Sequence, residues 1–274
     1  MSLHLDGRLL LVGAGNMGYA LLSGWLEGGL EPERILVQDP APQPRIASEL
    51  GAKGITAHAE VAALPEPPAV VLVAVKPQVM NHVLPQLARL LGPRSVVMSI
   101  AAGRRITGLA AHLPPGTAIV RAMPNTPASV GRGFTVAVGN AYATAGQREA
   151  CDGLLRAVGD VTWVEDEGLM DAVTAVSGSG PAYVFHLAEC LAEAGIAAGL
   201  APQLAQQLAR ATVAGAGELL HRSHLDAAQL RGGVTSPGGT TAAALEVLMG
   251  QNGLADLMHN AVAAATRRSR ELAK

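Results

Sequence analysis

Lysine is scarce in this chain of 274 residues, where it occurs at Lys53, Lys76 and Lys274. The other basic side chains are arginines, and 20 basic against 22 acidic residues leave a formal net charge of −2. Proteins that bind nucleic acid concentrate positive charge on one face or in one arm, and this sequence has no such concentration. The balance of charge therefore predicts no nucleic-acid partner.

Cysteine and long hydrophobic runs are also nearly missing. Cys151 and Cys190 lie far apart and form no C-x-x-C pair, which excludes a zinc ribbon and argues against a disulfide framework. The first residues contain no charged-then-apolar signal segment. No apolar run reaches the roughly 18 residues that a membrane-spanning helix needs. We therefore expect a soluble, cytoplasmic protein with no membrane partner.

The first half of the chain alternates between strand-like and helix-like segments. Its apolar runs are rich in Val, Leu and Ile and mostly lack polar alternation, as in strands that are covered on both faces. The runs are Leu9–Val12, Ile35–Val37, Ala69–Val75, Ser95–Ile100, Thr117–Val120, Phe134–Val138 and Val161–Val164. Helical spacing lies between several of them, at Asn16–Glu27, Gln78–Leu91 and Ile106–His112. This order predicts an α/β domain over residues 1–164, with a mostly parallel, doubly wound sheet.

The second half, residues 165–274, has a different character. Strand-like runs stop, and stretches rich in Ala and Leu take over with helical spacing. They are Leu169–Val176, Ala182–Ala198, Pro202–Leu220, Thr241–Met249 and Gly253–Leu272. The sequence therefore predicts a second domain that is entirely helical.

A glycine-rich segment connects the first expected strand to the first expected helix. It reads Gly13-Ala14-Gly15-Asn16-Met17-Gly18. In this order the first glycine allows a tight turn, the second lets the backbone approach a pyrophosphate, and the third lets helix and strand pack closely. The diphosphate of a dinucleotide then lies on the free N–H groups of the helix N-terminus. The segment predicts a Rossmann unit that binds NAD(H) or NADP(H).

The choice between these two cofactors stays open at this point. Asp39 ends the second expected strand, where a carboxylate can hold a ribose 2′-hydroxyl and repel a 2′-phosphate. Because Pro40 follows, Asp39 can equally cap the turn there. Arg45 is the nearest basic residue and could offset its charge.

Two segments of the helical half crowd hydroxyls and glycines before an expected helix. They are Val176-Ser177-Gly178-Ser179-Gly180-Pro181 and Val234-Thr235-Ser236-Pro237-Gly238-Gly239-Thr240-Thr241. Serine there can cap the helix, proline is tolerated in the first turn, and glycine leaves backbone N–H groups open to a small anion. Ordinary capping explains either segment alone. Two of them beside a nucleotide domain favour a substrate site.

Five motifs in order give the chain a resemblance to a known family. Ala74-Val75-Lys76-Pro77-Gln78 and Arg121-Ala122-Met123-Pro124-Asn125-Thr126-Pro127 join the glycine-rich segment and the two serine-containing segments. With these, the chain resembles the pyrroline-5-carboxylate reductases, which reduce the cyclic imine 1-pyrroline-5-carboxylate to L-proline. The resemblance implies NADPH or NADH as cofactor and a homo-oligomer formed through the helical domain. Enzymes of this kind commonly take NADPH.

The resemblance also implies roles for particular residues. Thr241 would place its hydroxyl near the imine nitrogen and is the candidate catalytic residue. The candidate substrate-binding residues are Ser236, Gly238, Gly239, Thr240, Ser177 and Ser179. The candidate cofactor-binding residues are Gly13, Gly15, Asn16, Met17, Gly18, Asp39, Val75, Lys76, Pro77, Met123, Pro124 and Asn125. The chain departs from the family at Gly232-Gly233, where an Asp is usual nearby, and at His58, where Asn is frequent.

Other hypotheses about the function make different demands on the sequence. Reductases of the β-hydroxyacid type use a Lys on the first long helix of the second domain, and Pro181–Glu193 contains no Lys. A reductase of another small cyclic imino acid or carbonyl compound and a non-catalytic nucleotide-binding regulator remain as alternatives. His186 and Cys190 have no third ligand at a suitable spacing and are interpreted as packing residues, and no metal is expected. The acidic run Glu165-Asp166-Glu167 is interpreted as helix capping.

Overall fold

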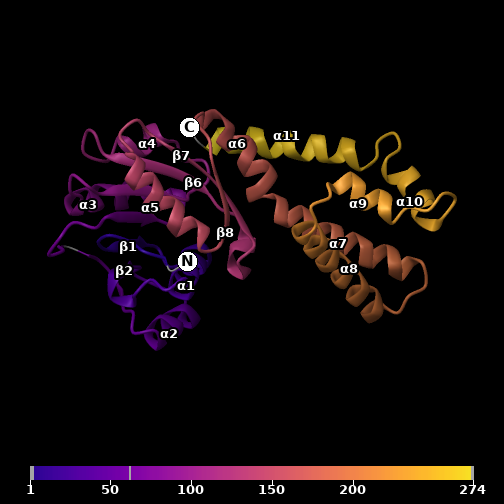
Figure 1. Cartoon of the computed structure of the whole chain (residues 1–274), viewed down its shortest axis with the longest axis horizontal. Coiled ribbons are helices and arrows are strands. Elements are labelled where there is room, and N and C mark those ends of the chain that lie inside the picture. The colour runs from indigo at the N-terminus through magenta and orange to yellow at the C-terminus, as the bar shows by residue number, and fades with distance from the viewer. Residues whose placement is uncertain (1–2, 62, 273–274) are drawn as a thin grey trace. The chain divides into compact units, whose positions relative to one another are not determined.

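The computed structural model of the chain describes residues 3–61 and 63–272 and contains two compact units, drawn in Figure 1. One unit comprises the residues up to Gly178 together with those from Thr266 onward, and the other is Ser179–Ala265. The sheet ends at Trp163, close to the boundary expected at residue 164. The helical turns after it belong to the same unit as the sheet, as does the end of the last helix.

The first unit is built on a sheet that has eight strands within the described residues, in the order β3-β2-β1-β4-β5-β6-β7-β8. Neighbouring strands are parallel, except that β6 and β7 are antiparallel. The strands are β1 (Leu9–Val12), β2 (Ile35–Gln38), β3 (Ala57–His58), β4 (Val70–Val73), β5 (Val96–Ser99), β6 (Ala118–Met123), β7 (Gly133–Gly139) and β8 (Gly159–Trp163). The two-residue β3 was not predicted, because so short a strand has no apolar run of its own.

Helices lie between the strands in chain order. The α-helices of this part are α1 (Asn16–Glu27), α2 (Pro44–Ala52), α3 (Met80–Leu87), α4 (Ile106–Ala110), α5 (Ala145–Arg156) and α6 (Met170–Val173). Short 3₁₀ turns are η1 (Pro32–Arg34), η2 (Pro77–Val79), η3 (Ala88–Leu90), η4 (Thr126–Val130) and η5 (Glu167–Leu169), and η6 (Thr174–Gly178) is π-helical. The predicted helix Gln78–Leu91 is thus a series of η2, α3 and η3.

The sheet is buried on both faces, which is why its strands read as continuous apolar runs. Alternate residues of β1 belong to different core clusters, with Leu9 and Leu11 on one face and Leu10 and Val12 on the other. The first cluster includes side chains of α1 and α5, and the second includes side chains of α3 and α4. The structure thus confirms the predicted doubly wound α/β fold of the N-terminal part.

The largest fully buried side chain, Trp25, shows how the first face is completed. Trp25 ends the apolar stripe of α1, and its indole Nε1 donates a hydrogen bond to the Leu154 carbonyl of α5 at 2.8 Å. A buried indole needs such a partner, because an unpaired N–H away from water is costly. This bond ties together two helices that are far apart in the sequence.

The second unit is entirely helical, as predicted. It contains α7 (Gly180–Ala197), α8 (Pro202–Arg222), α9 (Ala227–Gly233), α10 (Thr240–Leu248) and the first part of α11 (Leu254–Leu272). Small residues let α7 and α8 approach, since a Cβ at Gly195 would lie 3.3 Å from the Cβ of Ala205. Among the helices of the described residues, none is both long and apolar enough to cross a membrane.

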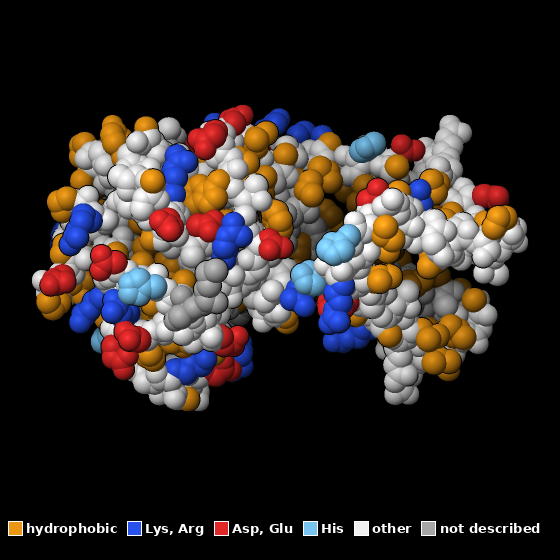
Figure 2. All heavy atoms as spheres, in the orientation of Figure 1, with side chains coloured by type: hydrophobic (Ala, Val, Ile, Leu, Met, Phe, Trp, Pro, Cys, Tyr) orange, Lys and Arg blue, Asp and Glu red, His pale blue; other side chains and the backbone are white. Residues whose placement is uncertain are grey.

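This helical unit has few buried apolar side chains for its size. Within residues 179–265, all of which the structure describes, the buried hydrophobic residues are Ala192, Ala205 and Ala209. Large hydrophobic side chains of α7, α8 and α10 are exposed instead, and Figure 2 shows hydrophobic side chains spread over the surface. Phe185 of α7 is 63% exposed and Val247 of α10 is 76% exposed. A domain with so small a core gains stability when another surface covers its apolar helices.

Candidate active site

The glycine-rich loop after β1 has the geometry that a dinucleotide requires. Gly13 has φ +94°, and a Cβ there would lie 2.9 Å from the Ala74 carbonyl oxygen. A Cβ at Gly18 would lie 2.2 Å from the Gly13 carbonyl oxygen. Around Gly15, no other described heavy atom comes within 4 Å of the position that a Cβ would take. Gly13 and Gly18 therefore serve packing, and Gly15 leaves open space at the N-terminus of α1, where a pyrophosphate fits.

This loop lies where an open α/β sheet normally binds ligands. β1 is flanked by β2 on one side and β4 on the other, so the strand order changes direction at β1. Ligands of such sheets bind at the carboxyl ends of the strands beside this switch point. Asn16 and Met17 follow in the first turn of α1, and both line a surface hollow of about 720 Å³.

Asp39 is placed at the end of β2 and makes two hydrogen bonds to the backbone. Its Oδ2 accepts from the N–H of Ala14 in the glycine-rich loop at 2.8 Å. Its Oδ1 accepts from the N–H of Ala41 at 2.9 Å, which closes the turn around Pro40. Asp39 therefore caps its own turn, and it also connects that turn to the glycine-rich loop.

The ends of β4 and β6 carry the other predicted cofactor residues. Val75 and Lys76 follow β4, and Pro77 begins η2. The Val75 side chain lies against the glycine-rich loop, since its Cγ1 is 3.0 Å from the position of a Cβ at Gly13. Met123 ends β6, and Pro124 and Asn125 lead into η4. The structure therefore brings the three motifs to one edge of one sheet.

The side chain of Asn125 is oriented by two hydrogen bonds. Its Oδ1 accepts from the N–H of Phe134 at the start of β7, at 2.9 Å, and its Nδ2 donates to the Ser177 hydroxyl at 3.2 Å. Met123 contacts the same segment, because a Cβ at Gly178 would lie 2.4 Å from the Met123 Cε. The first serine-containing segment is thus packed against the end of β6 within one compact unit.

One expectation for this segment is wrong in detail. Val176–Pro181 was predicted to lie immediately before a helix, with serine capping as the alternative to a substrate site, but α6, η6 and α7 follow one another almost without interruption. Ser179 has helical dihedral angles, φ −87° and ψ −23°, and its side chain makes no capping hydrogen bond in the described structure. Inside a helical run, the N–H groups two and three residues after a serine already donate to backbone carbonyls. The serine hydroxyl therefore has no free N–H group to cap. The π-helical turn that replaces the expected start is a feature often found at functional sites.

The second serine-containing segment does start a helix. Ser236, Pro237, Gly238 and Gly239 form a β-turn closed by a 3.0 Å hydrogen bond from the Gly239 N–H to the Ser236 carbonyl. Pro at the second position and a glycine with φ +69° at the third are the features of a type II turn.

Helix α10 begins immediately after this turn. Gly239 is its N-cap and has no side chain to occupy the first N–H groups of the helix. Thr240 and Thr241 form the first turn, so their backbone N–H groups are available to an anion. Thr235 anchors the segment to α9, donating from Oγ1 to the Arg231 carbonyl at 2.6 Å. Gly232 and Gly233 complete the last turn of α9.

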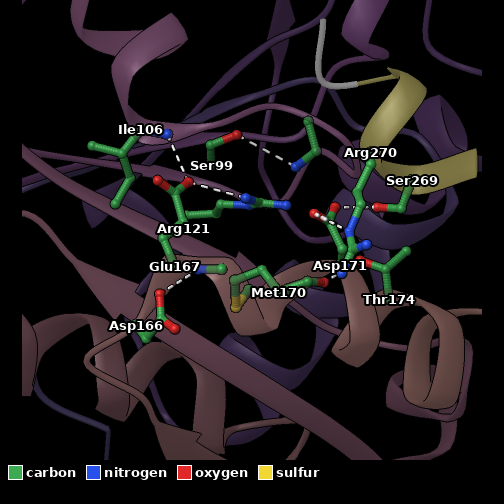
Figure 3. A network of polar contacts seen from close by, with 12 residues as sticks. Ser99, Ile106, Arg121, Asp166, Glu167, Met170, Asp171, Thr174, Ser269 and Arg270 are labelled. Atoms are coloured by element: carbon green, nitrogen blue, oxygen red, sulfur yellow. Dashed lines mark hydrogen bonds and ion pairs between the residues drawn. The ribbon is translucent and has the colours of Figure 1, made fainter. Parts of the chain in front are cut away.

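A polar network that the sequence did not predict joins β6, α4 and η5 and is drawn in Figure 3. Arg121, in β6 and 3% exposed, forms an ion pair with Glu167 at 3.0 Å between Nη1 and Oε1. The same Glu167 oxygen accepts from the N–H of Ile106 at 2.8 Å and so caps α4. The expected capping of the helical turn that the acidic run opens is made by Asp166, whose Oδ1 accepts from the Gly168 N–H at 2.7 Å. An arginine within an apolar strand was the available signal, because a buried charge needs a partner.

The same network fastens the end of α11 to the sheet unit. Ser269 donates to the Asp171 carboxylate at 2.6 Å, and both residues are buried. Arg270 adds a weaker contact, with its Nε 3.9 Å from the second Asp171 oxygen. No group of three or more His, Cys, Asp or Glu side chains suited to a metal ion occurs in residues 3–61 and 63–272.

Comparison with protein families assigns both parts of the chain. Residues 167–272 match the family described as pyrroline-5-carboxylate reductase dimerisation. Residues 8–103 match the family described as NADP oxidoreductase coenzyme F420-dependent. The two matches lie in the helical and nucleotide-binding parts of the chain, respectively.

Individual relatives agree over nearly the whole length. The pyrroline-5-carboxylate reductase of Pseudomonas aeruginosa is 40% identical over 269 residues, covering 97% of each chain. That of Synechocystis sp. is 42% identical over 270 residues, covering 97% of this chain and 98% of the relative.

Solved structures give the same result. The pyrroline-5-carboxylate reductase of Coxiella burnetii has a TM-score of 0.90 at 35% identity, covering 98% of this chain and all of that one. A Plasmodium falciparum pyrroline carboxylate reductase with NADP bound has a TM-score of 0.82 at 28% identity, covering 98% and 99%. The chain belongs to the pyrroline-5-carboxylate reductase family, which confirms the predicted resemblance, the fold class and the class of NAD(P)-dependent oxidoreductase.

Proposed function

We propose that this protein reduces 1-pyrroline-5-carboxylate to L-proline with NADPH or NADH, in the cytoplasm. The observation that carries the proposal is the pair of open helix N-termini, at α1 and α10. The first follows a glycine-rich loop with space at Gly15, and the second follows a turn with Gly238 and Gly239. One suits the diphosphate of a dinucleotide, and the other suits the carboxylate of a small substrate.

The cofactor would be held by three segments at the carboxyl edge of the sheet. Backbone N–H groups of Gly15, Asn16 and Met17 at the N-terminus of α1 would bind the diphosphate, while Gly13 and Gly18 shape the loop around it. Val75, Lys76 and Pro77 would line the cofactor from the end of β4. Met123, Pro124 and Asn125 would lie near the nicotinamide, and the two hydrogen bonds of Asn125 support a fixed position for this segment.

The substrate would be held by the start of α10. The backbone N–H groups of Thr240 and Thr241, with the Ser236 hydroxyl, would bind its carboxylate, and Gly238 and Gly239 form the turn that presents them. Ser179 would assist as a further substrate contact, a role supported by its lack of a capping bond. For Ser177 the bond to Asn125 supports a positioning role as well.

The reaction needs a hydride at carbon and a proton at nitrogen. The bound reduced nicotinamide supplies the hydride. A protonated cyclic imine is already electrophilic, so the protein need not provide a strong acid. The hydroxyl of Thr241 would orient the imine nitrogen by a hydrogen bond. Holding the imine in one orientation lowers the barrier by several kcal/mol.

The test is a direct assay. Purified protein, 1-pyrroline-5-carboxylate and either NADPH or NADH should lose absorbance at the nicotinamide band and form proline. The absence of turnover with both cofactors, in protein that is folded by circular dichroism, would overturn the proposed function.

We also propose that the chain acts as a homo-oligomer joined through its helical unit. Support comes from the exposed apolar side chains of α7, α8 and α10 and from the match to a dimerisation family. Sedimentation analysis should give a dimer or a multiple of it. Phe185→Glu should shift the protein toward the monomer, and a wild-type monomer at micromolar concentration would contradict this proposal.

A further inference from the structure

We propose that this reductase prefers NADH to NADPH, and that Asp39 sets the preference. The proposal rests on the proposed function for its biological meaning, but it concerns the binding of the cofactor and can be tested by binding alone. This preference differs from that of the family, whose members commonly use NADPH.

Asp39 occupies the position of the ribose-binding acid of a Rossmann unit. It stands 21 residues after Gly18 and directly after β2. Strand β2 lies next to β1, the strand that leads into the glycine-rich loop. In a Rossmann unit an acidic residue about 20 residues after the motif faces the adenine ribose. A carboxylate there accepts from a 2′-hydroxyl and repels a 2′-phosphate.

Two backbone hydrogen bonds hold the Asp39 carboxylate in place. The Ala14 N–H holds Oδ2 at 2.8 Å, and the Ala41 N–H holds Oδ1 at 2.9 Å. The backbone is held as well, because the Asp39 N–H donates to the His58 carbonyl at 2.9 Å. A 2′-phosphate would therefore meet a fixed negative charge. Swinging the side chain aside would break two hydrogen bonds, one of them to the cofactor loop itself.

Two basic residues lie between Asp39 and β3. They are Arg45, in the first turn of α2, and Lys53, directly after its last turn. The Nη1 of Arg45 is 2.7 Å from the Glu49 carboxylate, and its guanidinium lies over the Tyr19 ring, 5.7 Å from the centroid. A hydrogen bond from Tyr19, and then the charge of Arg45, lower the pKa of Glu49 and keep it ionised as the partner of Arg45. The charge of Arg45 is therefore already paired with a carboxylate before a 2′-phosphate arrives.

Both oxygens of Asp39 retain a lone pair after these two bonds. A carboxylate offers about four acceptor sites, so two backbone bonds leave room for the ribose hydroxyls. The same side chain can therefore position the loop and hold the ribose of NADH. With NADPH, the Asp39 carboxylate that positions the loop would also repel the 2′-phosphate.

The experiment measures the dissociation constants of NADH and NADPH by isothermal titration calorimetry, without substrate. Wild-type protein should bind NADH at least about tenfold more tightly than NADPH. Asp39→Asn removes the charge while keeping one acceptor, and Asp39→Ser serves as a second variant if the first unfolds. Both should weaken NADH binding and move the NADPH/NADH ratio by about tenfold or more toward NADPH.

Arg45→Ala is the matched control. It should leave the ratio of the two dissociation constants within about twofold, because the charge of Arg45 is already paired with Glu49. Tighter binding of NADPH by the wild type, an unchanged ratio in Asp39→Asn, or a selective loss of NADPH binding in Arg45→Ala would each overturn the proposal. A protein that binds NADH selectively but does not reduce 1-pyrroline-5-carboxylate would instead contradict the proposed function alone.

Discussion

Asn125 and Ser177 are 52 residues apart in the sequence and joined by a hydrogen bond of 3.2 Å from Nδ2 to Oγ. Asn125 follows strand β6, and Ser177 belongs to the π-helical turn η6. The bond connects the Met-Pro-Asn motif to the first serine-containing motif. Two motifs that the sequence presents separately therefore form one structural element of the sheet unit.

Gly178→Ala tests whether this element positions the proposed cofactor-binding residues Met123, Pro124 and Asn125. The new methyl group would lie 2.4 Å from the Met123 Cε, so the flexible Met123 side chain must move. We expect kcat to fall by about tenfold with a loss of stability under about 1.5 kcal/mol. Steady-state kinetics and urea denaturation give the two values. Gly180→Ala, where no described heavy atom lies within 4 Å of the new Cβ, is the matched control and should change neither.

Glycines of the cofactor loop should separate into two classes. Gly15→Ala has open space around its Cβ and should fold normally, but it should weaken cofactor binding by about tenfold or more. Gly18→Ala brings a methyl group 2.2 Å from the Gly13 carbonyl and should cost more than about 2 kcal/mol of stability. Thermal melts and cofactor titrations distinguish the two. Equal melting temperatures for both variants would show that the packing role of Gly18 is misassigned.

Thr241→Ala should lower kcat by about tenfold or more, while cofactor affinity stays nearly unchanged, because the hydroxyl is proposed to act on the imine alone. Thr241→Ser keeps a hydroxyl on the first turn of α10 and should recover most of the activity. The measurement is turnover combined with a cofactor titration. Loss of cofactor binding in Thr241→Ala would show that this loop contacts the cofactor and not the substrate.

Glu167→Ala should destabilise the sheet unit by about 2 kcal/mol or more. It leaves the Arg121 guanidinium buried without its carboxylate and removes the cap of α4. Glu165→Ala is the matched control. Glu165 also pairs with an arginine, Arg148, at 3.4 Å, but its side chain is 84% exposed, so the cost should stay below about 0.5 kcal/mol. Chemical denaturation of both variants measures the difference, and equal losses would contradict the importance of the buried pair.

Cys151 should make stability depend on alkaline pH. Burial raises the pKa of the Cys151 thiol from 9.0 to about 12, so the folded state prefers the neutral thiol. Its contribution is complete below about pH 9 and is lost as the pH rises toward 12, because the unfolded thiol ionises first. Between pH 9 and 10.5 the loss amounts to about 2 kcal/mol. Urea midpoints at the two pH values should fall less in Cys151→Ala than in the wild type.

Much of the fold can be predicted from local sequence patterns. The predictions fail where a segment is too short to show a period, or where the same residues occur in two kinds of structure. Helix α1 was predicted with its observed bounds, because a glycine-rich turn and an amphipathic run mark its start and length. Strand β3 and helix α2 were missed, since two residues carry no period and Pro44–Ala52 is weakly apolar. The π-helical turn η6 before Ser179 was also missed, because the serines and glycines that precede a helix occur in such a turn as well.

The sequence by itself determined the family and the chemistry of the chain, because glycines with obligatory conformations and motifs in a set order can be read without coordinates. It also determined the doubly wound sheet, through strands that are apolar on both faces. Only the tertiary structure decided what each polar side chain contacts. Asp39 holding Ala14, Arg121 pairing with Glu167 and Ser269 bonding Asp171 all join residues that are distant along the chain. Such pairs depend on where the folded backbone brings two groups together in a place with little water, and no local pattern records that.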